Sequence, residues 1–576
     1  MTHVADSIID FDGLQPGIGH LQSPKPAVLR GRNFRWHLRG PYSGWGNSVV
    51  APHRGGAIHK MQATFRMEDR AVLCTDTGIY EMLDGSCCNW RAVCTYTPRI
   101  WPDPCDNDYP WTSAYVGDSY FFAHPTVGII EYSRCEGGWR CQLDLSCTVP
   151  AVGGHASLAA ELGFEIPTPP ATPRFSGYET LFPATPAGAQ LIAGPIFAIT
   201  QANNQLIVLA RDTVSWSAPD HGRNLQCDMH TGAGFQSLSV GRYGRPLSVK
   251  ETVDGFVTYT TNAMLQFRQV QHHAMYRVDE ISTAHMPLNP WCIVQHDSKA
   301  HFFLAEHGLF VTDGNFPKPF EPVIGQYLAE LEIPRNRMHT VQHEIAMFYH
   351  PENGEIFISL RHPDPTLRQP HVYTRSLVFN EKYTKWCSFD QPHRWIGPVN
   401  FCEQRKSHLS YGFIHADLAV RQFDMSRFNA SYNGTDCTCI PAPLDSYIEL
   451  GPIAPRDQKF IGRNSEFQEY RLHTGPMFTT EEHRHAMSTL FKTDAYEEYT
   501  DTWSWYHARS ASSTDGYIIN NAQWDDGWPV GQNYFTQDYV CNHMGVTHSI
   551  MLLADQIGQY YELQRVDFQL FMTVIQ

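Results

Sequence analysis

The sequence lacks any run of about eighteen apolar residues, so we expect no membrane-spanning helix. The opening residues MTHVADSIIDFDG are acidic and mixed, unlike the basic and apolar start of a secretory signal, so we expect no export by that route. Basic side chains are also few, with 43 Lys and Arg against 59 Asp and Glu and a formal net charge of −16. This deficit argues against a protein that grips nucleic acid phosphates.

The catalytic and nucleotide-binding motifs with a clear mechanism are missing as well. The chain contains no G-x-x-x-x-G-K-[ST], G-x-S-x-G or H-E-x-x-H motif and no EF-hand loop. We therefore predict no catalytic, cofactor-binding or metal-binding residues, no cofactor, and a protein that is not an enzyme. A pair of carboxylates for glycoside hydrolysis would leave no such local signature, because it can converge from distant strands.

The fifteen cysteines are an odd number spread over 576 residues, which does not suggest a full disulfide framework. We expect reduced, mostly buried thiols in a protein made in a cytosol. No group of cysteines has the two C-x-x-C knuckles of a zinc ribbon, so buried thiols are favoured over a structural metal. The groups weighed are Cys87, Cys88, Cys94 and Cys105, then Cys135, Cys141 and Cys147, then Cys437 and Cys439.

The 29 histidines raise the question of a metal site. On a strand, the adjacent His272 and His273 would point to opposite faces, which is poor ligand geometry. His483 and His485 would share a face, but the sequence offers no third ligand, so a solvated polar loop is favoured. Three further histidines flank one expected hairpin, where surface or cross-strand roles are favoured over coordination: His296, His301 and His307.

Two other groups could carry chemistry. The stretch Asp103 to Asp108, DPCDND, alternates carboxylates as a calcium loop would, but it lacks the glycine and the final glutamate, so a plain acidic turn is favoured. Several tryptophans could stack against sugars, although filling the space between β layers is the more usual role. They are Trp90, Trp101, Trp111, Trp503, Trp505, Trp524 and Trp528.

Short β-type runs with a period close to two, closed by Gly, Asn or Asp turns, fill most of the chain. Several share one order of strand, polar turn, apolar strand, turn and third strand, which is how a degenerate β-propeller looks in sequence. We therefore predict an all-β fold with a propeller-like body, in preference to an array of sandwiches. The runs are 71–83, 115–132, 197–216, 247–270, 293–313, 340–360, 376–389 and 409–423.

The predicted divisions are an N-terminal β segment over 1–60, the propeller-like body over 61–440 and a C-terminal β-sandwich over 441–576. Prolines interrupt the body at 166–191, which must be an extended insertion. The one convincing helix is Val323 to Ile333, between two prolines. Residues 549–574 are expected to form two alternating strands separated by a polar turn.

This pattern resembles the tail hub or nozzle proteins of short-tailed bacteriophages, also called tubular or packaged-DNA stabilisation proteins. The resemblance rests on short, degenerate motifs spread over most of the chain, none of them catalytic. They are GRNFRW at 31–36, RGPY at 39–42, VSWS at 214–217 with Asp220, TGAGF at 231–235, DGFVTY at 254–259 and IELGP at 448–452. The Pro-rich insertion is not part of that pattern.

The resemblance implies a structural virion protein that forms a ring in the tail, commonly a hexamer, beside portal, adaptor and other tail proteins. Such a ring retains packaged DNA and conducts it during ejection, without sequence-specific contacts. The net acidity fits a wall that must not hold a polyanion, and it predicts acidic side chains along a central channel. Terminal nozzle, adaptor-side hub and tail decoration remain open.

Two other functions remain as alternatives. The tryptophans and dispersed carboxylates would suit a carbohydrate-binding or carbohydrate-active propeller that acts on host-surface glycans. A host-surface adhesin would place binding in the fragment that starts near Pro441.

Overall fold

The computed structural model confirms an all-β chain. It describes residues 2–8, 12–14, 27–37, 40–43, 46–51, 63–68, 70–82, 90–135, 137–143, 146–148, 189–191, 195–225, 232–270, 276–321, 344–362, 364–400, 409–424, 430–433, 440–443, 445–453, 465–474, 488–493, 535–545, 548–554 and 563–572. Within these residues the helices are one α-turn and two 3-10 turns: α2 (Val240–Tyr243), η1 (Pro104–Asn107) and η3 (Pro365–Leu367). The expected helix at 323–333 lies outside the described residues.

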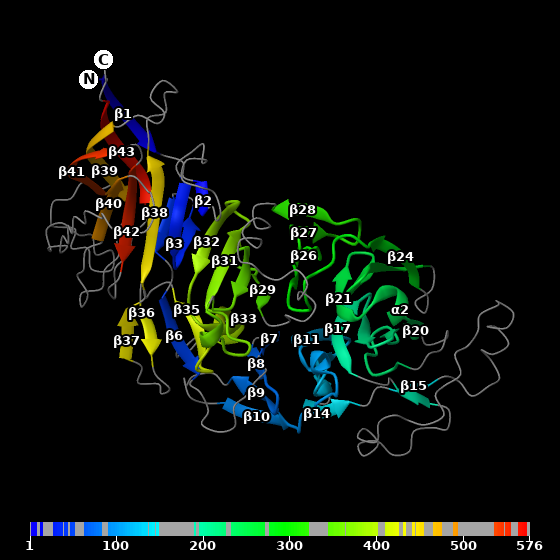
Figure 1. The fold of residues 1–576 in the computed structure, drawn as a ribbon. Coiled ribbons are helices and arrows are strands. Elements are labelled where there is room, and N and C mark those ends of the chain that lie inside the picture. Colours follow the sequence, from blue (N-terminus) through cyan, green and yellow to red (C-terminus); the bar gives the residue numbers. More distant parts are fainter. Residues whose placement is uncertain are drawn as a thin grey trace.

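Seven antiparallel sheets of the described chain stand around a common centre, as the blades of a β-propeller do (Figure 1). Five of them use four consecutive strands. These are β7 (Ala63–Met67), β8 (Arg70–Cys74), β9 (Gly78–Met82) and β10 (Trp90–Thr95); β11 (Thr112–Val116), β12 (Ser119–His124), β13 (Gly128–Ser133) and β14 (Gly138–Leu143); β17 (Ile196–Ala202), β18 (Gln205–Ala210), β19 (Thr213–Trp216) and β20 (Gly234–Ser237); β21 (Pro246–Thr252), β22 (Gly255–Thr260), β23 (Met264–Gln269) and β24 (Tyr276–Ser282); β25 (Ile293–Gln295), β26 (His301–Ala305), β27 (Gly308–Thr312) and β28 (Lys318–Glu321).

The other two blades borrow strands from the start of the chain. β29 (Ile345–His350), β30 (Glu355–Leu360), β31 (Arg375–Asn380) and β32 (Lys385–Phe389) are extended by β4 (Phe34–His37) and β5 (Gly40–Ser43). β33 (His393–Asn400), β34 (Leu409–His415) and β35 (Val420–Asp424) are completed by β6 (Gly46–Ala51), which pairs with β35. The N-terminal region therefore supplies the outer strand of the last blade.

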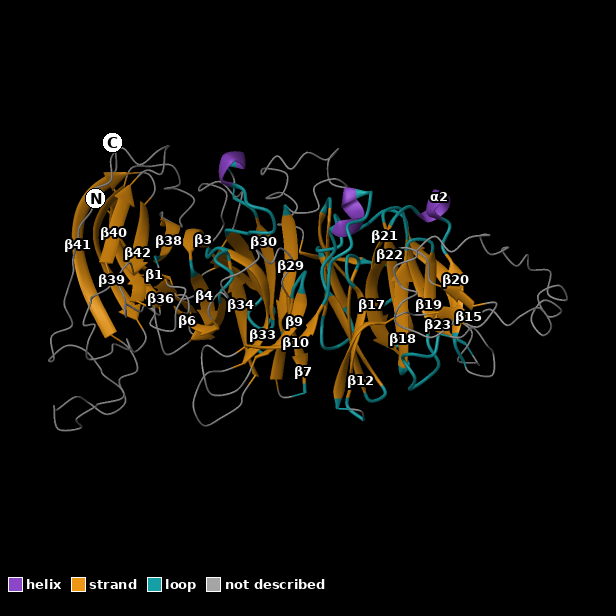
Figure 2. Cartoon of the chain, turned by 90° about the horizontal axis from the view of Figure 1, so that it is seen from below, coloured by secondary structure: helices purple, strands orange, loops and turns teal. Residues whose placement is uncertain are grey.

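Two further sheets lie beside the propeller and are together called the sandwich. One has the order β1-β43-β39-β41 and the other β2-β3-β38-β42-β40. Figure 2 shows them at one end of the molecule, together with both termini. Their bounds are β1 (Thr2–Ile8), β2 (Asp12–Leu14), β3 (Ala27–Arg32), β38 (Ser446–Ile453), β39 (Ser465–Thr474), β40 (Ser488–Thr493), β41 (Phe535–Gly545), β42 (His548–Ala554) and β43 (Leu563–Met572).

Long-range pairing changes the arrangement that the sequence suggested. The described strands of 1–60 join four different sheets, and β1, β2 and β3 enter the C-terminal sheets. β42 and β43, expected to follow one another across a turn, lie in separate sheets. Of the Pro-rich insertion, only β16 (Ala189–Leu191) is described, and it pairs with β15 (Ser146–Thr148). A small hairpin, β36 (Ala430–Asn433) with β37 (Ile440–Pro443), precedes β38.

Apolar side chains between adjacent blades hold the ring together. Within one blade, Phe256 and Phe267 stack with ring centroids 4.5 Å apart. Tyr276 of the same blade packs against Phe256 and also against Trp216, which belongs to the preceding blade. Each such side chain stabilises the fold by about 1.5–3 kcal/mol when it is fully buried. Similar clusters fill the spaces between the other neighbouring blades.

Four buried histidines take part in this packing as neutral side chains. His301 Nε2 donates to the Glu251 carbonyl oxygen at 2.6 Å, so its Nδ1 accepts from the Tyr259 hydroxyl at 2.7 Å. This is the cross-strand role expected for His301. Burial lowers the pKa of His301 and His393 to about 4, and that of His124 and His350 to about 3.

We predict that acidification destabilises the fold between about pH 6.5 and 4. In this range the unfolded chain protonates these four histidines and the native chain does not, so each removes about 1.4 kcal/mol per pH unit from the free energy of unfolding. Carboxyl groups whose pKa burial raises oppose this effect: Asp390, with a pKa of about 6, and Glu352 and Glu381. Urea unfolding at several pH values measures the slope. His350→Gln should reduce this slope by the contribution of one histidine, about 1.4 kcal/mol per pH unit. His307→Gln, at an exposed position, should leave the slope unchanged. Equal slopes for both variants would contradict the prediction.

A buried ion pair ties the N-terminal region to the propeller. Arg35 on β4 pairs with Glu355 on β30, and both residues are 2% exposed. The guanidinium also lies 5.0 Å from the ring centroid of Phe423 and 5.4 Å from that of Phe357.

We predict that Arg35→Met lowers the free energy of unfolding by about 3–5 kcal/mol, because it leaves the Glu355 carboxylate buried without its cation. The double variant Arg35→Met, Glu355→Leu should recover much of this loss. Arg277→Met, at an exposed pair with Asp279, should change the value by less than about 1 kcal/mol. Chemical denaturation measures all three, and an Arg35→Met loss as small as that of Arg277→Met would refute the assignment.

Candidate functional site

A cavity of about 330 Å³ lies where the inner strands of the blades converge. Each of the seven blades contributes a residue of its first strand to the wall: Thr64, Thr112, Thr200, Lys250, Ile293, Tyr349 and Trp395. This convergence follows from the fold, because the first strand of a blade is its inner edge. Ser113 and Asp297 on the wall are exposed, so solvent reaches the cavity there.

Aromatic rings form much of the wall. The Trp395 ring centroid lies 5.2 Å from that of Phe348, 5.8 Å from that of Phe65 and 6.1 Å from that of Trp291. Trp111 of β11 also lines the cavity. Of the two ionised side chains on the wall, Asp297 is exposed, while burial lowers the pKa of Lys250 to about 8.

A polar cluster lies beside the mouth of the cavity. His296 Nε2 is 3.3 Å from a Glu381 carboxylate oxygen, and His296 Nδ1 is 2.7 Å from the Ser298 hydroxyl. Burial raises the pKa of Glu381, and it also raises the pKa of Tyr349 beside it. His296 is thus a turn residue held by its neighbours, and His307 is exposed, as the surface interpretation expected.

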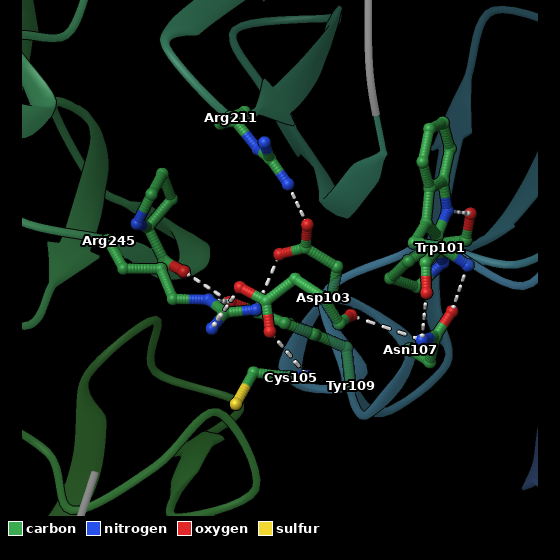
Figure 3. Close-up of polar contacts among 10 residues, drawn as sticks. Trp101, Asp103, Cys105, Asn107, Tyr109, Arg211 and Arg245 are labelled. Atoms are coloured by element: carbon green, nitrogen blue, oxygen red, sulfur yellow. Dashed lines mark hydrogen bonds and ion pairs between the residues drawn. The ribbon is translucent and has the colours of Figure 1, made fainter. Parts of the chain in front are cut away.

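The acidic stretch at 103–108 forms a clamp between blades rather than a solvated turn (Figure 3). Asp106 in η1 is 2% exposed and pairs with Arg211 of the β18–β19 turn and with Arg245, whose Nη2 lies 2.5 Å from Asp106 Oδ1. The stretch forms a turn, as the sequence predicted, but Asp106 and Asp108 are buried, because the residues before β11 and β21 pack together.

The rest of the clamp fixes the same loop. Arg245 Nε donates to the Tyr109 hydroxyl at 3.1 Å, and that hydroxyl donates to the Pro246 carbonyl oxygen at 2.6 Å. Asn107 closes the loop by accepting from the Trp101 backbone N–H at 2.7 Å and donating to the Trp101 carbonyl oxygen at 3.0 Å. These partners make the cluster a structural element.

Some of the other residues singled out in the sequence belong to the described part of the structure, and others do not. Trp101 and Trp111 are buried, as a core role predicts. Among the described residues, no three His, Cys, Asp or Glu side chains converge as metal ligands would. The side chain of Trp90 is not described, and the remaining candidates lie outside the described residues: His272, His273, His483, His485, Cys87, Cys88, Cys437, Cys439, Trp503, Trp505, Trp524 and Trp528.

The cysteines depart from the expectation at one position. Cys74, Cys292 and Cys387 are buried thiols outside any disulfide, and Cys105 and Cys135 are thiols at less buried positions. Cys94, however, is disulfide-bonded to a cysteine whose side chain is not described. The expectation of wholly reduced thiols is therefore wrong at Cys94.

No family model and no curated protein matches the chain. Among solved structures, YCF48 from Cyanidioschyzon merolae matches with 10% identity and a TM-score of 0.33, over 66% of this chain and 99% of its own. Virginiamycin B lyase from Staphylococcus aureus matches with 10% identity and a TM-score of 0.35, over 66% and 98%. An extracellular domain of a hybrid two-component system from B. thetaiotaomicron matches with 9% identity and a TM-score of 0.35, over 66% and 42%. At this level the neighbours say nothing of activity. Within the described chain, no helix has the length and hydropathy needed to cross a membrane.

We predict that Asp106→Asn lowers the free energy of unfolding by about 2–4 kcal/mol, because two arginines lose their buried anion. Asp103→Asn is the matched control: its carboxylate is 48% exposed and 3.5 Å from Arg245 Nη1, so the cost should stay below about 1 kcal/mol. Urea unfolding of the two variants measures the difference. An equal loss of free energy of unfolding in both variants would show that the burial of Asp106 does not determine how much the clamp stabilises the fold.

Proposed function

We propose that this chain is a structural, non-enzymatic protein of a bacteriophage tail. Copies assemble into a ring, for which the resemblance implies six subunits, next to portal, adaptor and other tail proteins. The ring retains packaged DNA inside the virion and conducts it during ejection. The protein is made in the host cytoplasm and is incorporated into the tail as a nozzle or hub.

The observation that carries this proposal is the joint between propeller and sandwich. Two of the segments that carry the resemblance, 31–36 and 448–452, meet there, with Gly31 paired to Ile448. Asn33 sits in a left-handed turn at φ 51° and is buried, and its side chain bonds the backbone of both Asp390 and Asp445. Ser446 donates to the Asn33 carbonyl oxygen at 2.8 Å.

This joint supports a mechanical role. Its hydrogen bonds connect the β29–β32 blade with the chain at β38 of the sandwich. A rigid two-part subunit is suited to a ring that must keep its shape under load. This geometry explains two residues of the motif at 31–36. Asn33 makes the turn, and Gly31 lies too close to the ring of Phe34 to carry a side chain.

The cavity size decides where DNA would pass in such a ring. A volume of about 330 Å³ corresponds to about eleven water molecules at about 30 Å³ each. The major groove of B-DNA alone is about 12 Å wide. Duplex DNA therefore does not fit along the axis of one propeller, and the proposed lumen is the space enclosed by several copies.

Carbohydrate binding is the second candidate, and one observation favours it. Three tryptophans and two tyrosines line the cavity, and aromatic rings are the usual platforms for sugars: Trp111, Trp291, Trp395, Tyr349 and Tyr411. If the protein binds host-surface glycans, these rings would contact the sugar.

Electron microscopy of the purified protein and of its parent particle tests the ring. We expect closed rings with a central hole wider than a duplex, and the chain as a component of the tail. We also expect no retention of duplex DNA at low salt, where a basic surface would bind it most strongly. A protein that stays monomeric at high concentration and is absent from particles would refute the proposal, and saturable glycan binding by that monomer would favour the second candidate.

A further inference from the structure

The antiparallel strand order divides the connections of the propeller between two faces. In a four-stranded blade, the first-to-second and third-to-fourth turns lie at one end, and the second-to-third turn and the link to the next blade lie at the other. The described helical turns all belong to the second group, because η1 and α2 are in links between blades and η3 follows the second strand of its blade. Figure 2 shows these turns, drawn in purple, along one face, which we call the link face; the opposite face is the turn face.

One link reaches well beyond the two blades that it joins. Residues 101–109 lead from the β7–β10 blade into the β11–β14 blade. Asp106 pairs with Arg245, directly before β21. Asp108 Oδ1 lies 3.9 Å from Nε2 of His371, between β30 and β31. In the order of the ring, one blade separates each of these two contacts from the joined pair, on opposite sides, so the link extends over the axis.

Two buried indoles lie between this link and the cavity. Trp111 directly precedes β11 and Trp291 lies just before β25, so both are at the ends of first strands nearest the link face, and both line the cavity. They are 3% and 6% exposed. Trp111 is two residues after Tyr109, whose hydroxyl donates to the Pro246 carbonyl oxygen at 2.6 Å. The ring centroid of His371 lies 5.8 Å from that of Trp291. The link and its contacts therefore brace this end of the cavity.

The opposite end of the cavity lies at the turn face. Asp297 and Pro351 line the wall, and they belong to the β25–β26 and β29–β30 turns, which are first-to-second turns. Asp297 is exposed, and Tyr349 and Tyr411 of the wall are half-buried. Solvent therefore reaches the cavity from this face.

We propose that residues 101–109 form a fixed strap across the axis, which closes the cavity at the link face and leaves the turn face as its entrance. The buried Asp106 carboxylate holds the strap, because opening the strap would separate that charge from its arginines. A ligand of any class then reaches the cavity from the turn face. The strap lies within one subunit, so the proposal depends neither on ring formation nor on what the cavity binds.

Hydrogen exchange of the full chain, followed by mass spectrometry, tests whether the strap holds the link face. Asp106→Asn should raise exchange in the strap about tenfold, because the strap opens more often without its buried ion pairs. The increase should extend to the segments that the strap contacts at the link face, but not to turn-face segments of the same two blades. The link-face segments are 238–245 and 361–373, and the turn-face segments are 252–255 and 351–354.

Arg35→Met is the matched control, since it removes a buried ion pair whose Glu355 begins β30 at the turn face. It should leave exchange in the strap at the wild-type rate. His371→Asn is a second variant, because it removes one anchor of the strap and keeps a residue type that tolerates the left-handed backbone at φ 55°. This variant should raise exchange in the strap and in 361–373.

Hydroxyl-radical footprinting of the wild-type protein tests the entrance without a variant, because oxidation of each ring reports its contact with solvent. Tyr349 and Tyr411 should be oxidised, and Trp111 and Trp291 should be protected. In Asp106→Asn, oxidation of the two tryptophans should rise several-fold, while that of the two tyrosines stays unchanged.

Three results would overturn the proposal. The first is oxidation of Trp111 and Trp291 in the wild-type protein as fast as that of Tyr349, which would place an entrance at the link face. The second is exchange in Asp106→Asn that rises equally at both faces, which is a general loss of stability. The third is a rise confined to the strap, which would mean that it touches the other blades without holding them. If Asp106→Asn does not fold, His371→Asn is judged by the same outcomes.

Discussion

The pairing of the first fifty residues with strands made hundreds of residues later is the interaction on which the rest of the molecule depends. β6 completes the last blade through β35, β4 extends the neighbouring blade through β32, and β3 joins β38 in the sandwich. Bringing such distant segments together costs entropy that grows only slowly with separation, whereas each ladder adds hydrogen bonds and buried apolar surface. Ring closure and the attachment of the sandwich therefore both depend on this N-terminal region, which holds the Asn33 turn and the Arg35–Glu355 pair.

The closed ring places polar side chains in two different surroundings, between blades and at the axis. Side chains between blades can meet partners on two neighbouring sheets, as His301 does between Tyr259 and Glu251. At the axis the first strands of the seven blades converge on a space that no described strand fills, and residues of all seven line the cavity. The acidic clamp at Asp106 lies away from this space and finds both of its arginines within the protein. Position in the ring thus separates a structural polar cluster from a candidate binding site.

The local part of the fold could be predicted from the sequence, since alternation with period two and polar turns such as Asn203-Asn204 mark the hairpins within each blade. Pairing between distant segments has no local signal, so the distribution of β1 to β6 over several sheets, and the separation of β42 from β43, emerge only in three dimensions. The burial of Asp106 and the disulfide of Cys94 depend on such neighbours as well. Lys250 lies in the polar run KET, and nothing in this local sequence indicates that its strand is the inner edge of a blade.

The adjacent ends of the chain have a consequence for its synthesis. Thr2 pairs with Met572, so β1 has no native partner until β43, more than 550 residues later, has been translated. At about 5–20 residues per second, that interval is about 30–110 s. During this time β1 is an unpaired strand edge, and β6 remains one until β35 has been made; such edges are templates for association with other chains. The same edges could recruit chaperones or neighbouring nascent chains, so yield in cells should be more sensitive to the rate of elongation than to the stability of the finished protein.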